Sequence, residues 1–158
     1  ELQKLYMLWM DSLPEDAAKE VKKLYKNRKN EGLDLWITKP RKAEWLAQNL
    51  ENPFRSWDGE EHITPANAKK AADLYRKTRA AMVKLIDGAG KDIEKDAEAL
   101  VRDYTEGFNK MDRKKPFIDT IERDEVFTAL DGILSLIPEE LSIDEDKLID
   151  LFDQLKEF

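Results

Sequence analysis

The sequence contains no cysteine, a single histidine and few residues that interrupt helices. Only six of its 158 residues are glycine and six are proline. Without cysteine the chain cannot form disulfides, thiolate zinc sites, iron–sulfur clusters or a cysteine nucleophile. The glycines and prolines stand at the ends of apparent elements. Charged residues make up 39% of the chain, and they recur at helical spacing. This combination favours an all-α fold.

No long hydrophobic run is present either. A membrane span requires roughly 18 consecutive apolar residues, and no segment approaches that length. The apolar opening segment ELQKLYMLWM has no basic region before it and no small-residue cleavage site after it, so we do not predict a signal peptide. We expect a cytoplasmic protein and leave open whether an upstream segment has been removed.

The longest helical signal runs from Thr64 to Ile86. Thr64 suits the N-cap, Pro65 suits the first helical position, and Gly88 follows the last turn. Apolar residues recur on one side of this helix: Ala68, Ala71, Ala72, Tyr75, Met82, Leu85 and Ile86. The alanines allow a second helix to approach closely. A second helix over 91–111 follows after a short turn, and the two should form an antiparallel hairpin.

The remaining pattern predicts a bundle of six or seven helices in one domain. Further helices are expected over 2–10, 13–30, 38–50, 117–137 and 142–155, with caps at Ser12, Thr120 and Ser142. The segment LDLWIT at 33–38 alternates like a strand, but we found no partner for it and interpret it as an extended connector. Residues 1–50 could form a semi-independent helical subdomain packing on 64–158.

Charge is distributed unevenly along the chain. Residues 19–42 carry nine basic and three acidic residues, a net charge of +6, whereas residues 119–158 carry three basic and thirteen acidic residues, a net charge of −10. The two ends could attract each other or could simply be solvated faces. Alternatively, the acidic end could bind a basic partner.

The long loop 51–63 contains Phe54 and Trp57. These aromatic residues could close one end of the bundle. Alternatively, Trp57 could anchor an exposed contact surface that includes Trp36 and Trp45.

Catalytic patterns are weak. His62 has no recognisable nucleophile motif to act upon, GAGK at 88–91 is too short for a phosphate-binding loop, and the acidic run at 144–146 lacks the glycine of a calcium loop. We predict no cofactor, no metal and no enzymatic activity.

Two alternatives remain. Carboxylate pairs three residues apart, Glu122 with Glu125 and Asp150 with Asp153, could serve an Mg²⁺-dependent nucleotide hydrolase, although such spacing is expected by chance in so acidic a segment. The basic stretch 19–42 could bind nucleic acid, which the acidic pI near 4.9 opposes.

Residues 104–134, YTEGFNKMDRKKPFIDTIERDEVFTALDGIL, resemble a pattern in small acidic helical bacterial proteins of unknown function. The shared feature is a helix ending in FN, a polar turn and a helix start that resembles I-x-T-I-E-R. Some of these proteins look like immunity proteins, which block a partner toxin. The resemblance implies a protein-binding role and transfers no catalytic residue.

We therefore predict a non-catalytic protein-binding or inhibitory protein whose acidic C-terminal helical surface engages a basic protein partner. We leave its oligomeric state open. The candidate acidic residues are Glu122, Asp124, Glu125, Asp131, Asp146, Asp150 and Asp153, and the aromatic candidates are Trp57 and Phe54.

Overall fold

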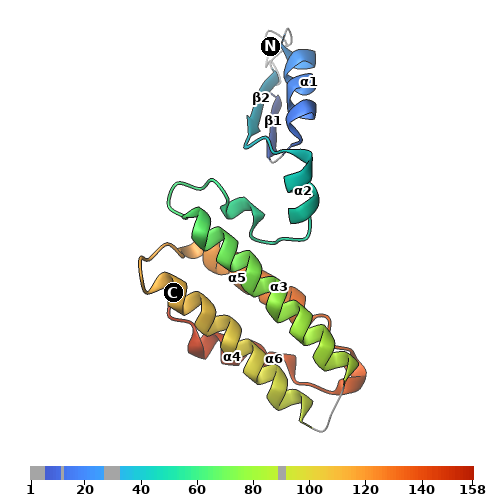
Figure 1. Cartoon of the computed structure of the whole chain (residues 1–158), viewed down its shortest axis with the longest axis vertical. Coiled ribbons are helices and arrows are strands. Elements are labelled where there is room, and N and C mark those ends of the chain that lie inside the picture. The colour runs from blue at the N-terminus through green and yellow to red at the C-terminus, as the bar shows by residue number, and fades with distance from the viewer. Residues whose placement is uncertain (1–5, 12, 27–32, 89–91) are drawn as a thin grey trace, which may run out of the picture. The chain divides into compact units, whose positions relative to one another are not determined.

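The computed structural model describes residues 6–11, 13–26, 33–88 and 92–158 (Figure 1). Its contacts divide the chain into two units, Glu1–Glu51 and Asn52–Phe158. The chain is predominantly helical, as predicted, with six α-helices in the described residues. Four of these six helices build the second unit, so the helical bundle, predicted over the whole chain, is confined to residues 52–158.

The first unit contains a β-α-β arrangement followed by a short helix. Strand β1 (Tyr6–Asp11) leads into helix α1 (Glu15–Tyr25), and strand β2 (Leu33–Thr38) returns beside β1. The two strands are parallel, in a register that pairs Tyr6 with Leu33 and Asp11 with Thr38. Helix α2 (Ala43–Asn49) comes next. Parallel strands need a crossover connection, and α1 lies within it.

Two predictions for the first unit are therefore wrong. The helix expected over 2–10 is a strand from Tyr6 onward, and the connector expected over 33–38 is its partner strand. In a short segment, apolar spacing cannot separate a helix from a strand with a continuous apolar run, the pattern typical of parallel sheets. The partner was missed because 21 residues lie between the strands.

Helices α1 and α2 also differ from expectation at their ends. The proposed cap Ser12 and the last residues of the helix expected over 13–30 lie outside the described residues, and α1 follows Pro14 without a side-chain cap. Helix α2 begins at Ala43, five residues after the expected start. Leu50, which follows its last turn, is 70% exposed.

The second unit is a four-helix bundle. Its helices are α3 (Pro65–Asp87), α4 (Ile93–Asp112), α5 (Thr120–Leu134) and α6 (Glu145–Leu155), with single-turn 3₁₀ helices η2 (Arg55–Trp57) and η3 (Glu139–Leu141) in the connections. Figure 1 shows α3 and α4 as the antiparallel hairpin that their short turn predicts.

Helices α4 and α6 run in the same direction. Near the start of α6, Lys147 binds Glu94 in the first turn of α4. Near the end of α6, the Leu155 carbonyl accepts a hydrogen bond from Asn109, in the last turn of α4, at 2.9 Å. Contacts at both ends therefore fix the alignment of these two helices.

The α3–α4 hairpin is closely packed, as its alanines predict. Ala71 and Ala72 are buried, and the Thr64 side chain accepts a hydrogen bond from the Asn67 amide as the predicted cap. On α4, a β-carbon at Gly107 would lie 2.4 Å from a methyl of Leu74 on α3. Because Gly107 has no β-carbon, the Leu74 side chain can pack against α4 at this point.

The hydrophobic core of the bundle is rich in aromatic side chains. Phe108 of α4 lies 5.4 Å from Phe54 and 4.9 Å from Tyr104 between ring centroids. The Tyr104 hydroxyl donates to the Val126 carbonyl of α5 at 3.0 Å, and burial raises the pKa of this phenol well above its usual value. The hydrogen bond satisfies a polar group that would otherwise be buried without a partner.

Two predicted caps are displaced by one or two residues. Asp119, rather than Thr120, caps α5, and Glu122 completes a capping box there. Asp144, rather than Ser142, caps α6 by accepting from the Lys147 amide at 3.1 Å. Both shifts place an aspartate at the N-cap, where its carboxylate also favours the positive end of the helix dipole.

Because every member of the buried core cluster lies between Phe54 and Phe152, residues 52–158 should fold without the first unit. We expect this fragment to keep its helical circular dichroism and to unfold in one cooperative transition, since it retains the contacts that bury its apolar surface. A fragment with helical content but no cooperative thermal transition would contradict this expectation.

Candidate functional site

The two aromatic candidates in the 51–63 loop are core residues. Phe54 and Trp57 are each 1% exposed, and their ring centroids lie 4.7 Å apart. Trp57 also meets Phe117 edge-on, at 5.7 Å. Neither side chain can anchor a partner at the surface, so the contact-surface hypothesis is wrong for both. They instead close one end of the bundle, which was the other interpretation of this loop.

Glu125 is the hydrogen-bonding partner of this loop. One carboxylate oxygen accepts from the Trp57 indole N–H at 2.5 Å, and the other accepts from the Ser56 hydroxyl at 3.1 Å. Because a buried indole N–H needs an acceptor, Glu125 has a structural role. Its assignment to an exposed acidic surface was wrong.

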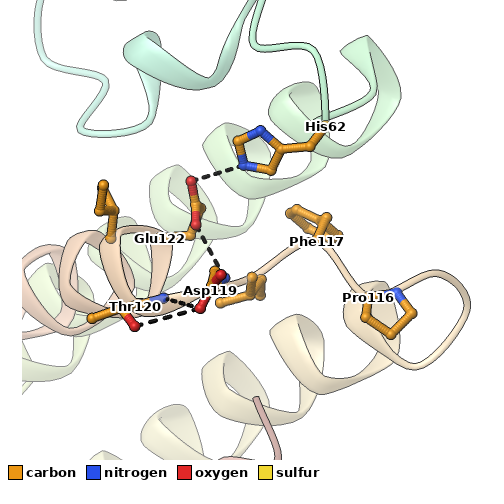
Figure 2. Close-up of a pocket in the computed structure, with 8 residues that line it drawn as sticks. His62, Pro116, Phe117, Asp119, Thr120 and Glu122 are labelled. Atoms are coloured by element: carbon orange, nitrogen blue, oxygen red, sulfur yellow. Dashed lines mark hydrogen bonds and ion pairs between the residues drawn. The ribbon is translucent and has the colours of Figure 1, made fainter.

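Glu122 joins the same loop to the start of α5 (Figure 2). One of its carboxylate oxygens lies 2.9 Å from His62 Nε2, and the other accepts from the Asp119 amide at 3.0 Å. Glu122 is 7% exposed, so it was also wrongly assigned to the acidic surface. His62 and the segment 116–122 line a cavity of about 690 Å³.

These contacts bear on the hydrolase alternative. Glu122 and Glu125 have the spacing of a metal-binding pair, but both oxygens of each are engaged by protein groups. Among the described residues, no three acidic, histidine or cysteine side chains gather closely enough to hold a metal ion. The histidine–carboxylate pair in the cavity joins the loop to α5.

The other acidic candidates lie on the surface. Asp124 and Asp131 are exposed on α5, seven residues apart and so on one face. Asp146, Asp150 and Asp153 are exposed on α6 with spacings of four and three, which also place them on one face. The structure thus separates the seven acidic candidates into two structural and five surface residues.

The same short pattern occurs on both helices. Phe127 of α5 has an aspartate three residues before it and four residues after it, at 124 and 131. Ile149 of α6 has aspartates at the same offsets, at 146 and 153. Both apolar residues are half-buried and pack against the core. We name these four aspartates with Phe127 and Ile149 the acidic stripes.

The stripes belong to neighbouring helices. The Phe127 ring lies 6.1 Å from the Phe152 ring of α6, and Phe152 is three residues from Ile149. Residues separated by three or four positions share a helix face. Phe127 and Ile149, the central residues of the two stripes, therefore lie at the edge of the core near this contact, and the aspartates flank them towards solvent. Sequence reasoning listed the aspartates but missed the paired spacing, which the sequence itself contains.

Two cations near the acidic stripes, Lys147 and Lys156, are already paired, whereas Arg123 beside Asp124 has its Nε buried without a hydrogen-bond partner among the described residues. Lys147 binds Glu94 and Glu98 of α4 at 2.6 and 2.8 Å, contacts that raise the pKa of its ammonium group and lower that of the Glu98 carboxyl. Lys156 binds Asp153 at 2.5 Å. Within the described part of the chain, no ion pair engages Asp124, Asp131 or Asp146.

The basic stretch 19–42 is only partly described. Lys19, Lys22 and Lys23 are exposed on α1, whereas Arg28 and Lys29 lie outside the described residues. Further on, the Arg41 guanidinium lies 4.6 Å from the centroid of the half-buried Trp45 ring and covers it. The side chain of Trp36 lies outside the described residues. Trp45 therefore presents less aromatic surface than the contact-surface hypothesis required.

Comparison with models of known families, with curated protein sequences and with solved structures finds no match to this chain. None of the helices that the structure describes has the length and apolar character required to cross a bilayer.

Replacing Trp57 with phenylalanine should lower the free energy of unfolding by about 1–3 kcal/mol, because the Glu125 carboxylate loses its indole donor inside the bundle. Chemical denaturation would measure the change. The control is Asp124→Asn, which changes the exposed residue next to Glu125 in the sequence. It should change the free energy of unfolding by about 0.5 kcal/mol or less. Equal effects of the two substitutions would contradict the assigned role of Glu125.

Glu122→Ala should destabilise the bundle by about 1–2 kcal/mol, because α5 loses half of its capping box. Glu122→Gln should cost less, since its amide oxygen can still accept from the Asp119 amide. Thermal and chemical denaturation of both variants would test this order. Equal losses for the two variants would show that charge, and not the cap, is the dominant contribution, because both remove the carboxylate.

Proposed function

We propose that this protein binds a basic protein partner through the acidic stripes of α5 and α6, without catalysing a reaction. The observation that carries the proposal is the repeated arrangement itself. Each helix presents a half-buried apolar residue between two exposed aspartates at the same offsets. Three of those four aspartates have no cationic partner among the described residues.

Electrostatics supports this role. Residues 52–158 contain 25 acidic and 17 basic residues, a net charge of −8, whereas residues 1–51 contain nine acidic and ten basic residues. All of the excess negative charge therefore belongs to the bundle. A surface of this sign attracts a basic protein over a Debye length, about 10 Å at 0.1 M salt, and accelerates its encounter.

The apolar residues of the stripes could supply the binding affinity that the charges alone do not. Exposed ion pairs contribute little net affinity because they are screened by water and salt. Phe127 and Ile149 keep part of their surface accessible, and burying it under a partner would add hydrophobic stabilisation. The aspartates would then control the association rate and the apolar residues the lifetime of the complex.

The first test is capture of partners from the source organism's lysate on the immobilised protein, with elution by salt and identification by mass spectrometry. We expect a basic protein that the triple variant Asp124→Asn, Asp131→Asn, Asp146→Asn captures poorly. With that partner purified, the triple variant should associate about tenfold more slowly at low salt.

The matched control removes the same three charges elsewhere on the bundle, as Glu61→Gln, Asp87→Asn, Asp103→Asn. All three of these residues are exposed. The control should keep most of the association rate. If both triple variants slow association equally, net charge alone acts and the stripes are not the binding surface. An unchanged rate in the first variant would also overturn the proposal.

A further inference from the structure

A second cavity of about 630 Å³ lies at the end of the bundle where α3 begins and α4 ends. Its lining includes Lys70 on α3, Lys110 on α4, and Arg113, Lys114 and Lys115 after the last turn of α4. None of its lining residues is a carboxylate. Five cations thus surround one concavity on a unit whose net charge is −8.

These cations differ in how far their charge is already balanced. Arg113 binds Glu157 at 2.5 Å and Glu106 at 3.1 Å, and these contacts raise the pKa of its guanidinium group. Lys110 lies 3.7 Å from Glu106. By contrast, Lys70, Lys114 and Lys115 have no carboxylate partner among the described residues. Their unbalanced charge is what a bound anion would neutralise.

The simplest account of basic residues here is compensation of a helix end. Cations near the last turn of α4 offset the partial negative charge of its free carbonyl groups. That account fits Lys110 and Arg113. It does not explain Lys70, which lies in the second turn of α3 and near the opposite, positive pole of a helix. Lys70 adds to the positive potential of the cavity instead of relieving it.

The lining of the cavity also contains apolar and neutral polar groups. Phe117 and Met111, which are 6% and 9% exposed, contribute the edges of their apolar side chains, and His62, Thr64 and Asn67 contribute polar groups at the start of α3. A volume of this size suits a small organic ligand and falls within the usual range for ligand sites. Lysines that converge without carboxylates are typical of sites for phosphate groups.

We propose that this cavity binds a phosphorylated small molecule carrying at least two phosphate groups, with its organic part against Phe117 and Met111. The site is separate from the acidic stripes. Its lysines come from two elements that only the folded hairpin brings together, α3 and the turn after α4. Binding should therefore stabilise the folded state.

The test uses the full chain with inorganic pyrophosphate as the probe, at constant ionic strength. We expect pyrophosphate to raise the melting temperature and to shift the NMR signals of the Met111 methyl and Phe117 ring. Lys114→Gln, Lys115→Gln should weaken pyrophosphate binding by about tenfold, as should Lys70→Gln on the other element to a smaller degree.

The matched control is Lys77→Gln, Lys84→Gln, which removes the same charge from exposed sites on α3 outside the cavity. It should leave the affinity within about twofold of the original. Equal losses in the two double variants, or equal stabilisation by sulfate, would show unspecific charge screening and overturn the proposal. If a phosphopeptide or single-stranded RNA binds at the same lysines while pyrophosphate does not, the small-molecule assignment is wrong.

Discussion

The hydrogen bond from the Trp57 indole to the Glu125 carboxylate is the constraint on which the bundle's architecture depends. It fixes the single-turn 3₁₀ helix η2 to a helix 68 residues further along the chain. With Trp57 held there, Phe54 and Phe117 complete an aromatic cluster at this end of the core. The pair of His62 with Glu122 adds a second attachment one turn away. Buried polar groups with satisfied partners specify one arrangement where apolar packing alone would allow several.

The sequence predicted the second unit far better than the first. Long periodic segments such as 64–86 contain enough turns for the helical pattern to be unambiguous, and its predicted cap and alanine face are present. The first unit depends on pairing between segments distant in sequence, which local periodicity does not contain. Tyr6–Asp11 could be recognised as a strand only once Leu33–Thr38 was recognised as its partner.

For a similar reason, the sequence did not show which acidic candidates are structural and which are exposed. Glu122 lies four residues before the buried Val126, and Glu125 four before the buried Ala129, so both lie towards the core side of α5. The spacing is visible in the sequence, but an acidic residue is rarely buried unless it is paired. The groups that pair with these two glutamates come from the distant loop 51–63, which the spacing does not reveal. Asp124 and Asp131 lie on the opposite side of α5, so their exposure could be predicted without knowing the tertiary contacts. The basic cavity also escaped detection, because Lys70 lies 40 or more residues before its other cations in the sequence.

The close approach of α3 and α4 limits how this protein can diverge. Ala71, Ala72 and Gly107 leave no room for larger side chains, whereas the exposed aspartates of α5 and α6 face solvent and carry little of the stability. Evolution could therefore exchange surface charges freely to follow a changing partner or ligand while these small residues persist. Proteins that diverge from this chain would then be recognisable by small side chains where α3 packs against α4, and not by any similarity of their surfaces.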